Sequence, residues 1–273
     1  MVPGTLPPQL ASFTMVPFCS RVAHGRFEYQ GRPIQLAPNF LPEPHALHGF
    51  GWERLWQLRE QTPRSCTLGF DHDERMSQAT GWPWAFSVEQ SFTLDDHALT
   101  VSATVCNLAS SPMPVGLGWH PHFPITADTD VQLQCAGAMS LDPKFLDAQF
   151  FDASGMPVSG ARELQDPQSP AQHNPLAARP WTQRHLDDIY VWRSGTASIA
   201  WPNQPWSLSI EPDSSLPHWV VYAPTDEGFM CIEPISHLPG ALNLPFMEAQ
   251  SGLRELAPGE HWSAATRFVT RPS

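Results

Sequence analysis

The chain has little charge, and it is poorest in positive charge. Only 15% of its 273 residues are charged, below the ~25% usual in globular domains. Fifteen Lys and Arg stand against 27 Asp and Glu, a formal charge of −12. Nucleic acids and anionic membranes both need clustered basic residues, and no apolar run approaches the ~20 residues of a membrane span. We therefore expect neither nucleic acid nor membrane as a partner.

Cysteine is also scarce, with five residues and no C-x-x-C pair. An odd, scattered set predicts reduced and mostly structural thiols. The first 20 residues, "MVPGTLPPQLASFTMVPFCS", contain no basic residue, and prolines interrupt their apolar run. That pattern argues against a secretion signal. Together these features predict a cytoplasmic protein.

Proline is present in excess, with 30 residues, about twice the usual share. We therefore expect few long helices, because proline breaks them. Strand signals are frequent instead. In "FSVEQSFTLDDHALTVSATV", residues 86–105, apolar positions alternate on both sides of a polar turn, which predicts a hairpin. Similar patterns predict strand pairs within 25–37, 197–210 and 218–235.

The stretch 152–180 differs, because small, polar and proline residues dominate it. We interpret it as a long surface loop, not a linker, since strand signals resume after it in the same style. The chain is 41% hydrophobic, enough for a sizeable core. We predict one all-β domain over residues 1–273, a sandwich or barrel of many short, mostly antiparallel strands.

A pair of histidines stands out in "LGWHPHFPIT". On a strand, His120 and His122 would face the same side, as a metal site, a proton-transfer site or part of the core. A β-barrel metal site would also need a nearby carboxylate, and none follows before Asp128, so we expect no metal. The core interpretation is favoured for His122 alone. It is weaker for His120, because other segments supply partners for proton transfer.

The most informative of these partners is Glu233 in "CIEP". A carboxylate at the end of an apolar strand pays desolvation unless it is paired, and its pKa tends to rise. A general base near neutral pH needs that adjustment. The alternative is a salt-bridged structural glutamate.

Three further segments offer polar candidates for a ligand site. His48 precedes Gly49, which permits close backbone approach. Asp187 and Asp188 point to opposite faces of a strand, so at most one would face a ligand easily. Arg21 is one of few cations, although an ordinary surface arginine is the simpler interpretation.

Tryptophan outnumbers tyrosine, 11 to 3. Flat aromatic faces suit the C–H faces of sugar rings, with polar groups taking the hydroxyls. Most tryptophans should still be core residues. Trp119, next to His120, is the candidate for contact with a ligand.

Taken in order, these segments resemble the aldose 1-epimerase (mutarotase) family. The similarity runs from about Pro17 to the C-terminus. It is carried by "PFCSRVAHGRF", "ALHGFGWERLW", "HPHF", "LDDIYVW", "CIEPISHLPGALN" and "LAPGEHW". The resemblance implies a galactose-mutarotase-like β-supersandwich and interconversion of the α and β anomers of a free monosaccharide. It implies no metal or organic cofactor.

The resemblance also implies roles for individual residues. Glu233 resembles the catalytic base, His120 the catalytic acid and His48 the second active-site histidine. The proton leaves the C1 hydroxyl and another reaches the ring oxygen, so we expect the carboxylate and the imidazolium on opposite sides of the sugar.

The substrate-binding candidates are the arginine near the sugar, the carboxylate that binds hydroxyls, and two neighbours of the catalytic acid. They are Arg21, Asp187 with Asp188 as the alternative register, Trp119 and His122. The sequence departs from the family at His122, where tyrosine is usual. The family's first strand pair also has almost no counterpart before Pro17, so either the start is placed late or that hairpin is missing.

Three alternatives remain open. A hexose-6-phosphate epimerase would need an arginine cluster to hold phosphate, for which the candidates are Arg21, Arg26, Arg32 and Arg54. A sugar-binding protein of the same fold would bind without catalysis. A metal-dependent β-barrel enzyme is the third. The sequence determines neither the preferred sugar nor the oligomeric state.

Overall fold

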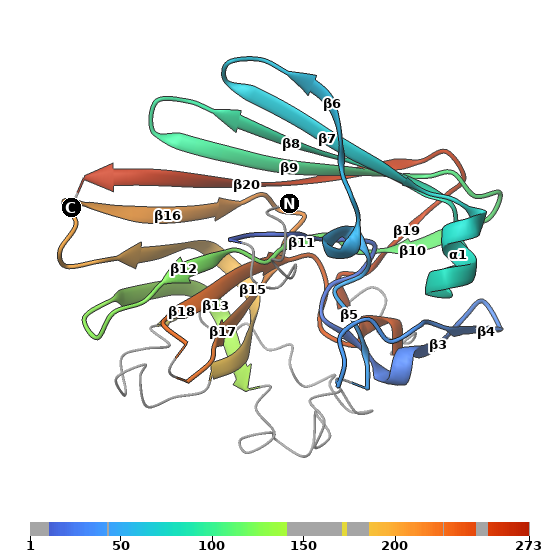
Figure 1. The fold of residues 1–273 in the computed structure, drawn as a ribbon. Helices are drawn as coiled ribbons and strands as arrows, with labels where there is room; N and C mark the ends of the chain where they lie inside the picture. The colour runs from blue at the N-terminus through green and yellow to red at the C-terminus, as the bar shows by residue number, and fades with distance from the viewer. Residues whose placement is uncertain are drawn as a thin grey trace.

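The protein is an all-β structure, as the sequence predicts (Figure 1). A computed structural model describes residues 11–42, 44–140, 171–173, 186–225, 227–243 and 251–272. Its strands are β1 (Thr14–Met15), β2 (Arg21–Val22), β3 (Arg26–Tyr29), β4 (Arg32–Gln35), β5 (Ala46–Leu47), β6 (Gln57–Gln61), β7 (Ser65–His72), β8 (Phe86–Leu94), β9 (Ala98–Asn107), β10 (Met113–Val115), β11 (Gly118–Trp119), β12 (His122–Pro124), β13 (Asp130–Ser140), β14 (Ala171–His173), β15 (Leu186–Ala200), β16 (Trp206–Pro212), β17 (His218–Ala223), β18 (Phe229–Ile235), β19 (Arg254–Leu256) and β20 (His261–Pro272). The helical segments are α1 (Glu74–Thr80) and the 3₁₀ turns η2 (Ala23–Gly25), η3 (Gly51–Glu53) and η6 (Ala241–Asn243).

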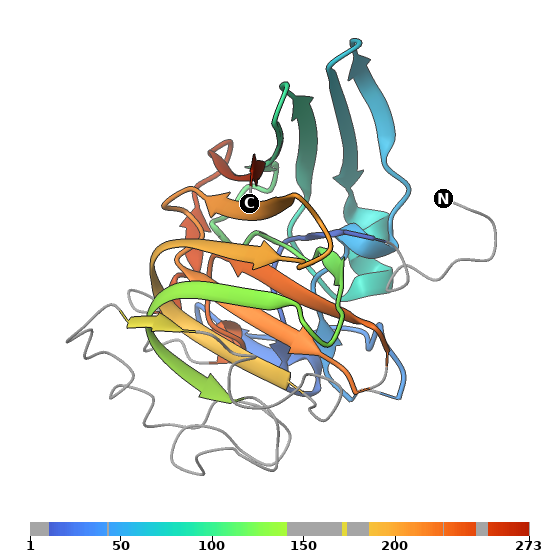
Figure 2. The same cartoon turned by 90° about the vertical axis from the view of Figure 1, so that its left-hand side faces the viewer.

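One large antiparallel sheet carries most of these strands, in the order β1-β11-β18-β17-β15-β16-β20-β9-β8-β7-β6. It bends at β15, which pairs with β17 through residues 186–190 and with β16 through residues 197–200. Figures 1 and 2 show the result: β6 to β9 lie in one layer, and β13, β15, β17 and β18 in another. The bend gives the sandwich its two layers.

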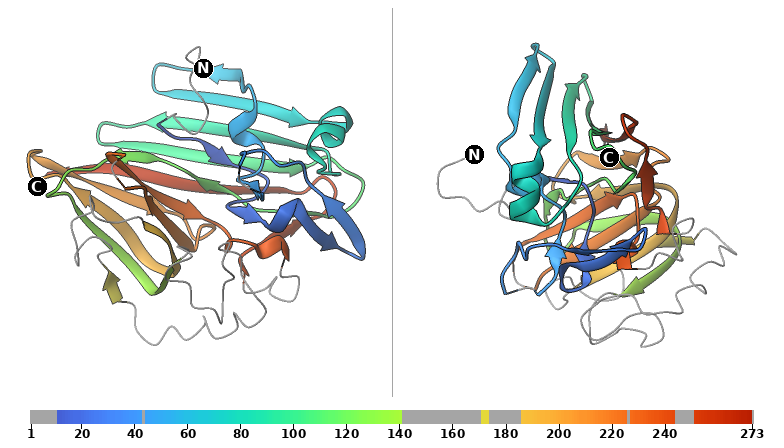
Figure 3. Two further views of the ribbon diagram at one scale, coloured as in Figure 1. Left: turned by 60° about the horizontal axis from the view of Figure 1, so that its bottom comes forward. Right: turned by 90° about the vertical axis from the view of Figure 1, so that its right-hand side faces the viewer.

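The four strand pairs predicted from sequence are all present as hairpins. The tightest joins β3 to β4, where Gln30 and Gly31 both have positive φ, of 50° and 75°. Two such residues are typical of the turn whose twist suits a two-residue hairpin. Smaller pairs, β2–β5, β3–β4 and β10–β19, lie beside the large sheet (Figure 3).

The buried apolar side chains form two cores. The first lies against β7, β8 and β9 and contains the fully buried Trp82 and Trp119. The second is built on β13, β15, β17 and β18 and includes Val221 and Ile232. Because side chains alternate along a strand, the residues beside Val221 and Ile232 face the other way. The face of this layer that is turned away from the second core can therefore carry polar groups.

Two expectations fall mainly outside the described residues. Of the predicted loop 152–180, the structure describes only Ala171–His173, which forms β14 and pairs with β13. The question of a missing first hairpin concerns residues before β1, and 1–10 are not described. One domain over residues 1–273 stays a prediction. Within the described ranges, no helix has the length and apolar character needed to cross a bilayer.

Candidate active site

A cavity of about 360 Å³ opens on the outer face of the second layer. It is lined by aromatic residues, several polar groups and a few aliphatic ones. They are Phe13, Ser20, Arg21, Phe40, Leu47, His48, Trp52, His120, His122, Asp187, Val220, Tyr222, Phe229 and Glu233. The volume is within the range of small-molecule sites.

Strand register explains why His120 and Glu233 meet there. Gly118 of β11 lies opposite Ile235 of β18, and His122 of β12 lies opposite Cys231. The register is the same on both sides of the short break at His120, which therefore sits opposite Glu233. Residues two apart on a strand share a face, so two cross-strand pairs stand side by side in the cavity wall.

The register of the neighbouring strands adds further residues to the same cavity wall. On the far side of β18, Val220 lies opposite Glu233 and Tyr222 lies opposite Cys231. Asp187 of β15 lies opposite Tyr222 in turn. The polar wall of the cavity is thus one face of β12, β18, β17 and β15, turned away from the second core.

His120 and Glu233 are in direct contact, with Nε2 3.0 Å from Oε1, and both are buried. Phe13 holds the imidazole from one side: the two rings stack at 4.5 Å with 19° between their planes. The expectation that acid and base stand on opposite sides of a sugar does not match this apposition. The C1 hydroxyl and the ring oxygen are bonded to the same carbon, so two touching groups can reach both.

His48 is held by an unusual backbone arrangement. It has a φ of 57°, and Ser20, beside it, has a φ of 58°, both in a region that costs energy for residues other than glycine. The two hold each other: the His48 N–H donates to the Ser20 carbonyl at 2.9 Å, and the Ser20 N–H donates to His48 Nδ1 at 3.2 Å. Because Nδ1 accepts, the ring proton of the neutral form sits on Nε2.

Burial lowers the pKa of His48 well below its ordinary value, and the charges of His120 and Arg21 lower it further. The His48 ring is therefore neutral near pH 7. Its edge faces the ring of His120, with centroids 5.1 Å apart. A neutral imidazole with a fixed tautomer is a hydrogen-bond donor, suited to a sugar oxygen.

Arg21 forms an ion pair at 3.3 Å with Asp187, at the β15 side of this polar wall. The segment that carries Arg21 is braced by Asn243 from the "HLPGALN" motif. Asn243 accepts a hydrogen bond from the Ala23 N–H at 2.9 Å and donates one to the Arg26 carbonyl at 2.6 Å. This motif therefore acts as scaffolding for the arginine.

Comparison with known proteins identifies the family of this chain. The family model described as "Aldose 1-epimerase" matches residues 5–269, nearly the whole chain. The chain belongs to the aldose 1-epimerase family. Membership supports a sugar epimerase of the mutarotase kind, an isomerase, and a sugar as its substrate.

Individual relatives support the family assignment. The uncharacterized protein YphB of Escherichia coli K12 is 30% identical over 255 residues, which are 91% of this chain and 79% of that protein. A crystal structure of an E. coli K12 protein provisionally described as an aldose 1-epimerase has a TM-score of 0.77 at 28% identity, covering 98% of this chain and 86% of the other. A galactose mutarotase-like protein of Clostridium acetobutylicum shares the fold, with a TM-score of 0.76 at 16% identity, covering 96% and 79%.

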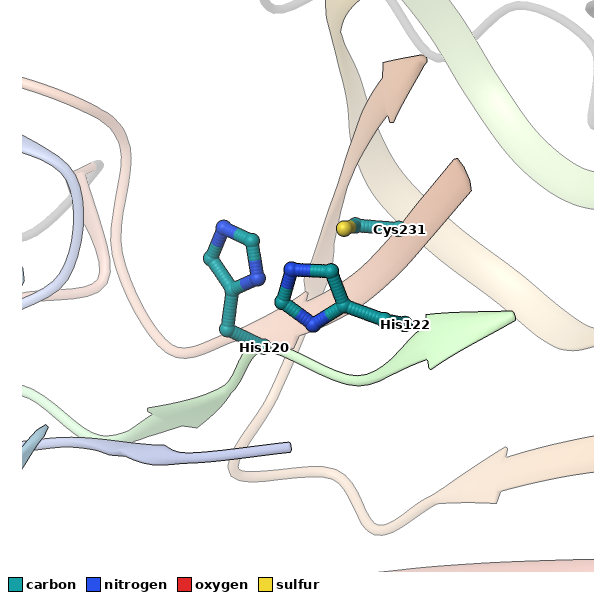
Figure 4. A group of neighbouring side chains, drawn as sticks. All are labelled: His120, His122 and Cys231. Carbon is teal, nitrogen blue, oxygen red and sulfur yellow. The ribbon is translucent and has the colours of Figure 1, made fainter. Parts of the chain in front are cut away.

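His122 stands where the resemblance to the family leads us to expect tyrosine. Its ring lies beside that of His120 (Figure 4), at 4.9 Å and tilted by 31°. The His122 ring is also 5.0 Å from that of Phe229. Burial, followed by the charge of His120, lowers the pKa of His122 to about 4. His122 is thus a neutral lining residue of the cavity, and the favoured core interpretation covers only part of its environment.

Trp119 and Asp188 are two of the residues predicted to contact a sugar. Trp119 is 1% exposed and packs in the first core, because it alternates with His120 along the chain; the expected sugar contact is corrected accordingly. Asp188 pairs in register with Val221, a second-core position, whereas Asp187 reaches the cavity. The side chain of Asp188 lies outside the described part of the structure.

Sequence reasoning missed several lining residues. Phe13, Phe40, Tyr222 and Phe229 come from four different segments and carry no motif. Trp52, one of the 11 tryptophans that the sequence assigns mostly to the core, also lines the cavity. Alternation within β17 could have indicated Tyr222, but only the cross-strand register shows that it adjoins Asp187.

Proposed function

We propose that this family member is an aldose 1-epimerase that interconverts the α and β anomers of a free aldose. The supporting observation is the buried contact between His120 and Glu233 at 3.0 Å, in a cavity of monosaccharide size. The pair places a proton acceptor beside a proton donor. Anomer exchange requires both at neighbouring oxygens of one carbon.

In the proposed reaction, the Glu233 carboxylate takes the proton of the C1 hydroxyl while the His120 imidazolium protonates the ring oxygen. The C1–ring oxygen bond breaks, leaving an open-chain aldehyde, a protonated Glu233 and a neutral His120. Rotation about C1–C2 presents the other carbonyl face. Ring closure returns both protons in reverse, so the enzyme ends as it began.

The other lining residues have binding roles in this proposal. His48 donates its Nε2–H to a sugar oxygen. Arg21 and Asp187 hold hydroxyls at the β15 side of the polar wall, and His122 lines the cavity near His120. Trp52 and Phe40 supply aromatic surface suited to the apolar face of a sugar ring.

The site has little to hold a phosphate. Among the described residues that line the cavity, Arg21 is the only Lys or Arg, and it is already paired with Asp187. Arg26 and Arg32 are exposed on the β3–β4 hairpin, and Arg54 does not line the cavity. The free sugar is therefore favoured over a hexose 6-phosphate.

Polarimetry tests the proposal. Freshly dissolved α-galactose, α-glucose and L-arabinose should reach anomeric equilibrium faster with the protein than in buffer, without added metal or nucleotide. Exchange at the buffer rate for pentoses, hexoses and their 6-phosphates, with the protein shown to be folded, would reject it. Binding without acceleration would support a sugar-binding protein.

A cytoplasmic location belongs to the same proposal. All five cysteines are free thiols, four of them buried. Such usage is typical of a reducing compartment.

A further inference from the structure

Three potential metal ligands gather behind and beside the cavity wall that carries His120. His120, His122 and Cys231 each present one ligand atom, and these atoms all lie within 4.8 Å of one another. Figure 4 shows the two imidazole rings side by side, with the Cys231 sulfur next to them. The register explains the grouping: Cys231 lies opposite His122 on the strand that also carries Glu233.

The ring of His120 is already oriented as a metal-bound histidine would be. Its Nε2 contacts the Glu233 carboxylate at 3.0 Å, while its Nδ1 is buried with no hydrogen-bond partner among the described residues. In His122 it is Nε2 that lies towards His120 and Cys231 in Figure 4, whereas Nδ1, on the far side of the ring from the sulfur, is buried without a partner among the described residues. Ligating histidines usually give their second ring nitrogen to a carboxylate, which fixes the tautomer and strengthens the ligand.

We propose that these three side chains form an inhibitory site for a divalent cation that accepts nitrogen and sulfur, with Zn²⁺ as the type. Two imidazole nitrogens and one thiolate suit zinc, and three protein ligands leave a fourth position for water. On binding, Cys231 loses its S–H proton to the buffer as the metal–sulfur bond forms. The cation is a reversible inhibitor and has no part in the sugar reaction.

Inhibition rests on the proposed function, whereas metal binding does not. With Nδ1 held by the cation, a proton given up from Nε2 of His120 would leave an imidazolate, a far poorer product than a neutral imidazole. His120 then no longer serves as the acid. The site depends on His122, because the tyrosine usual in the family would offer no imidazole nitrogen.

Binding is tested directly with Co²⁺ as a spectroscopic probe, followed by Zn²⁺. The purified protein should bind one Co²⁺ with thiolate-to-cobalt charge-transfer absorption and the visible bands of a four-coordinate site, and Zn²⁺ should displace it. X-ray absorption of the Zn²⁺-loaded wild-type protein should show one sulfur and at least two nitrogen neighbours. A shell of nitrogen and oxygen alone would overturn the site even if no variant folds.

Variants connect binding to inhibition. Cys231→Ala should lose the charge-transfer band and raise the half-inhibiting Zn²⁺ concentration at least about tenfold, while anomer exchange without metal persists. Cys66→Ala, at a thiol remote from the cavity, should behave as wild type. Unchanged zinc inhibition in folded Cys231→Ala overturns the proposal, as does loss of the band in Cys66→Ala. Metal binding without any anomer exchange would reject the proposed function and leave the site intact.

Discussion

The side chains of His120 and Glu233 touch before any sugar has entered the cavity, and this contact couples their roles. Both groups are largely buried, with side chains 11% and 3% exposed. A change in one therefore alters the charge and hydrogen bonding of the other. Their effects on catalysis should be read as those of a unit.

Glu233→Gln keeps the shape of the side chain but removes the proton acceptor, and His120→Gln removes the donor. Each should reduce kcat about 10²–10⁴-fold, the usual worth of a positioned acid or base. Because both act in one step, the double variant should be little worse than the poorer single. Polarimetric kinetics on all three variants test this, and near wild-type turnover in Glu233→Gln would contradict the mechanism.

For Asp187, which pairs with Arg21, the proposed role is to bind sugar hydroxyls. A group that only binds hydroxyls acts in the ground and transition states alike. Asp187→Ala should therefore raise KM while kcat stays within about threefold of wild type. Asp188→Ala is the matched control at the adjacent register position and should have little effect. If the control lost binding and Asp187→Ala did not, the register would be wrong by one.

At the scale of elements, the loop after β5 needs a strained and tightly packed backbone to position His48. Gly49 has a φ of 67°, and a Cβ there would lie 2.1 Å from the Val16 carbonyl oxygen. The Phe50 N–H donates to the same oxygen at 2.7 Å. The backbone passes so closely that only glycine fits next to the histidine.

Gly49→Ala should therefore be strongly destabilising, whereas Gly31→Ala provides a control that separates two causes. Gly31 also has a positive φ, 75°, but a Cβ there meets no atom within 4 Å. We expect Gly31→Ala to lower the free energy of unfolding by about 1–2 kcal/mol, the cost of backbone strain alone. The loss in Gly49→Ala should exceed it by at least about 1 kcal/mol. Urea unfolding would contradict this account if the two losses were equal.

At the scale of the whole molecule, buried neutral histidines link stability to pH. His72 lies in the first core, where burial lowers its pKa to about 4, and His237 is buried with its pKa lowered by the same cause to about 4. Both are hydrogen-bonded: the Cys19 N–H donates to Nε2 of His237 at 2.9 Å, and the His72 ring contacts Trp84 and Thr80. Protonation of His237 would break the bond from Cys19.

The direction in which stability changes with pH follows from proton uptake by the two states. A histidine in the unfolded chain is protonated below about pH 6.5. In the folded protein, His72 and His237 are protonated only below about pH 4. The unfolded state therefore binds more protons in this window, so stability is full above pH 6.5 and falls as the pH drops towards 4. Each residue accounts for at most about 3 kcal/mol.

Urea unfolding between pH 7 and 4.5 measures this effect. His72→Gln should reduce the slope of unfolding free energy against pH by about one proton, because it removes one histidine whose pKa is lower in the folded state. His261→Gln, at an exposed position on β20, should leave the slope unchanged. A wild-type free energy that is flat over this range would show that neither histidine is linked to folding.

The sequence by itself determined the local structure and the chemical inventory. Alternating apolar residues predict the hairpins because a half-buried strand has period two. The ordered motifs predict the family, and both are confirmed. Glu233, His120 and His48 could be proposed from sequence because they are polar groups in apolar or glycine-rich segments. Arg21 and Asp187 were selected through the resemblance to the family.

Only the tertiary structure decided how these residues meet. The register of β12 on β18 places His120 against Glu233 and His122 opposite Cys231, and no single segment encodes that pairing. Alternation also put Trp119 into the core, although from sequence it seemed as available as its neighbour. Phe13 reaches His120 from a segment more than 100 positions away. Cross-strand contacts of this kind depend on which strands pair and in which register, and the pattern of residues within one segment does not specify that pairing.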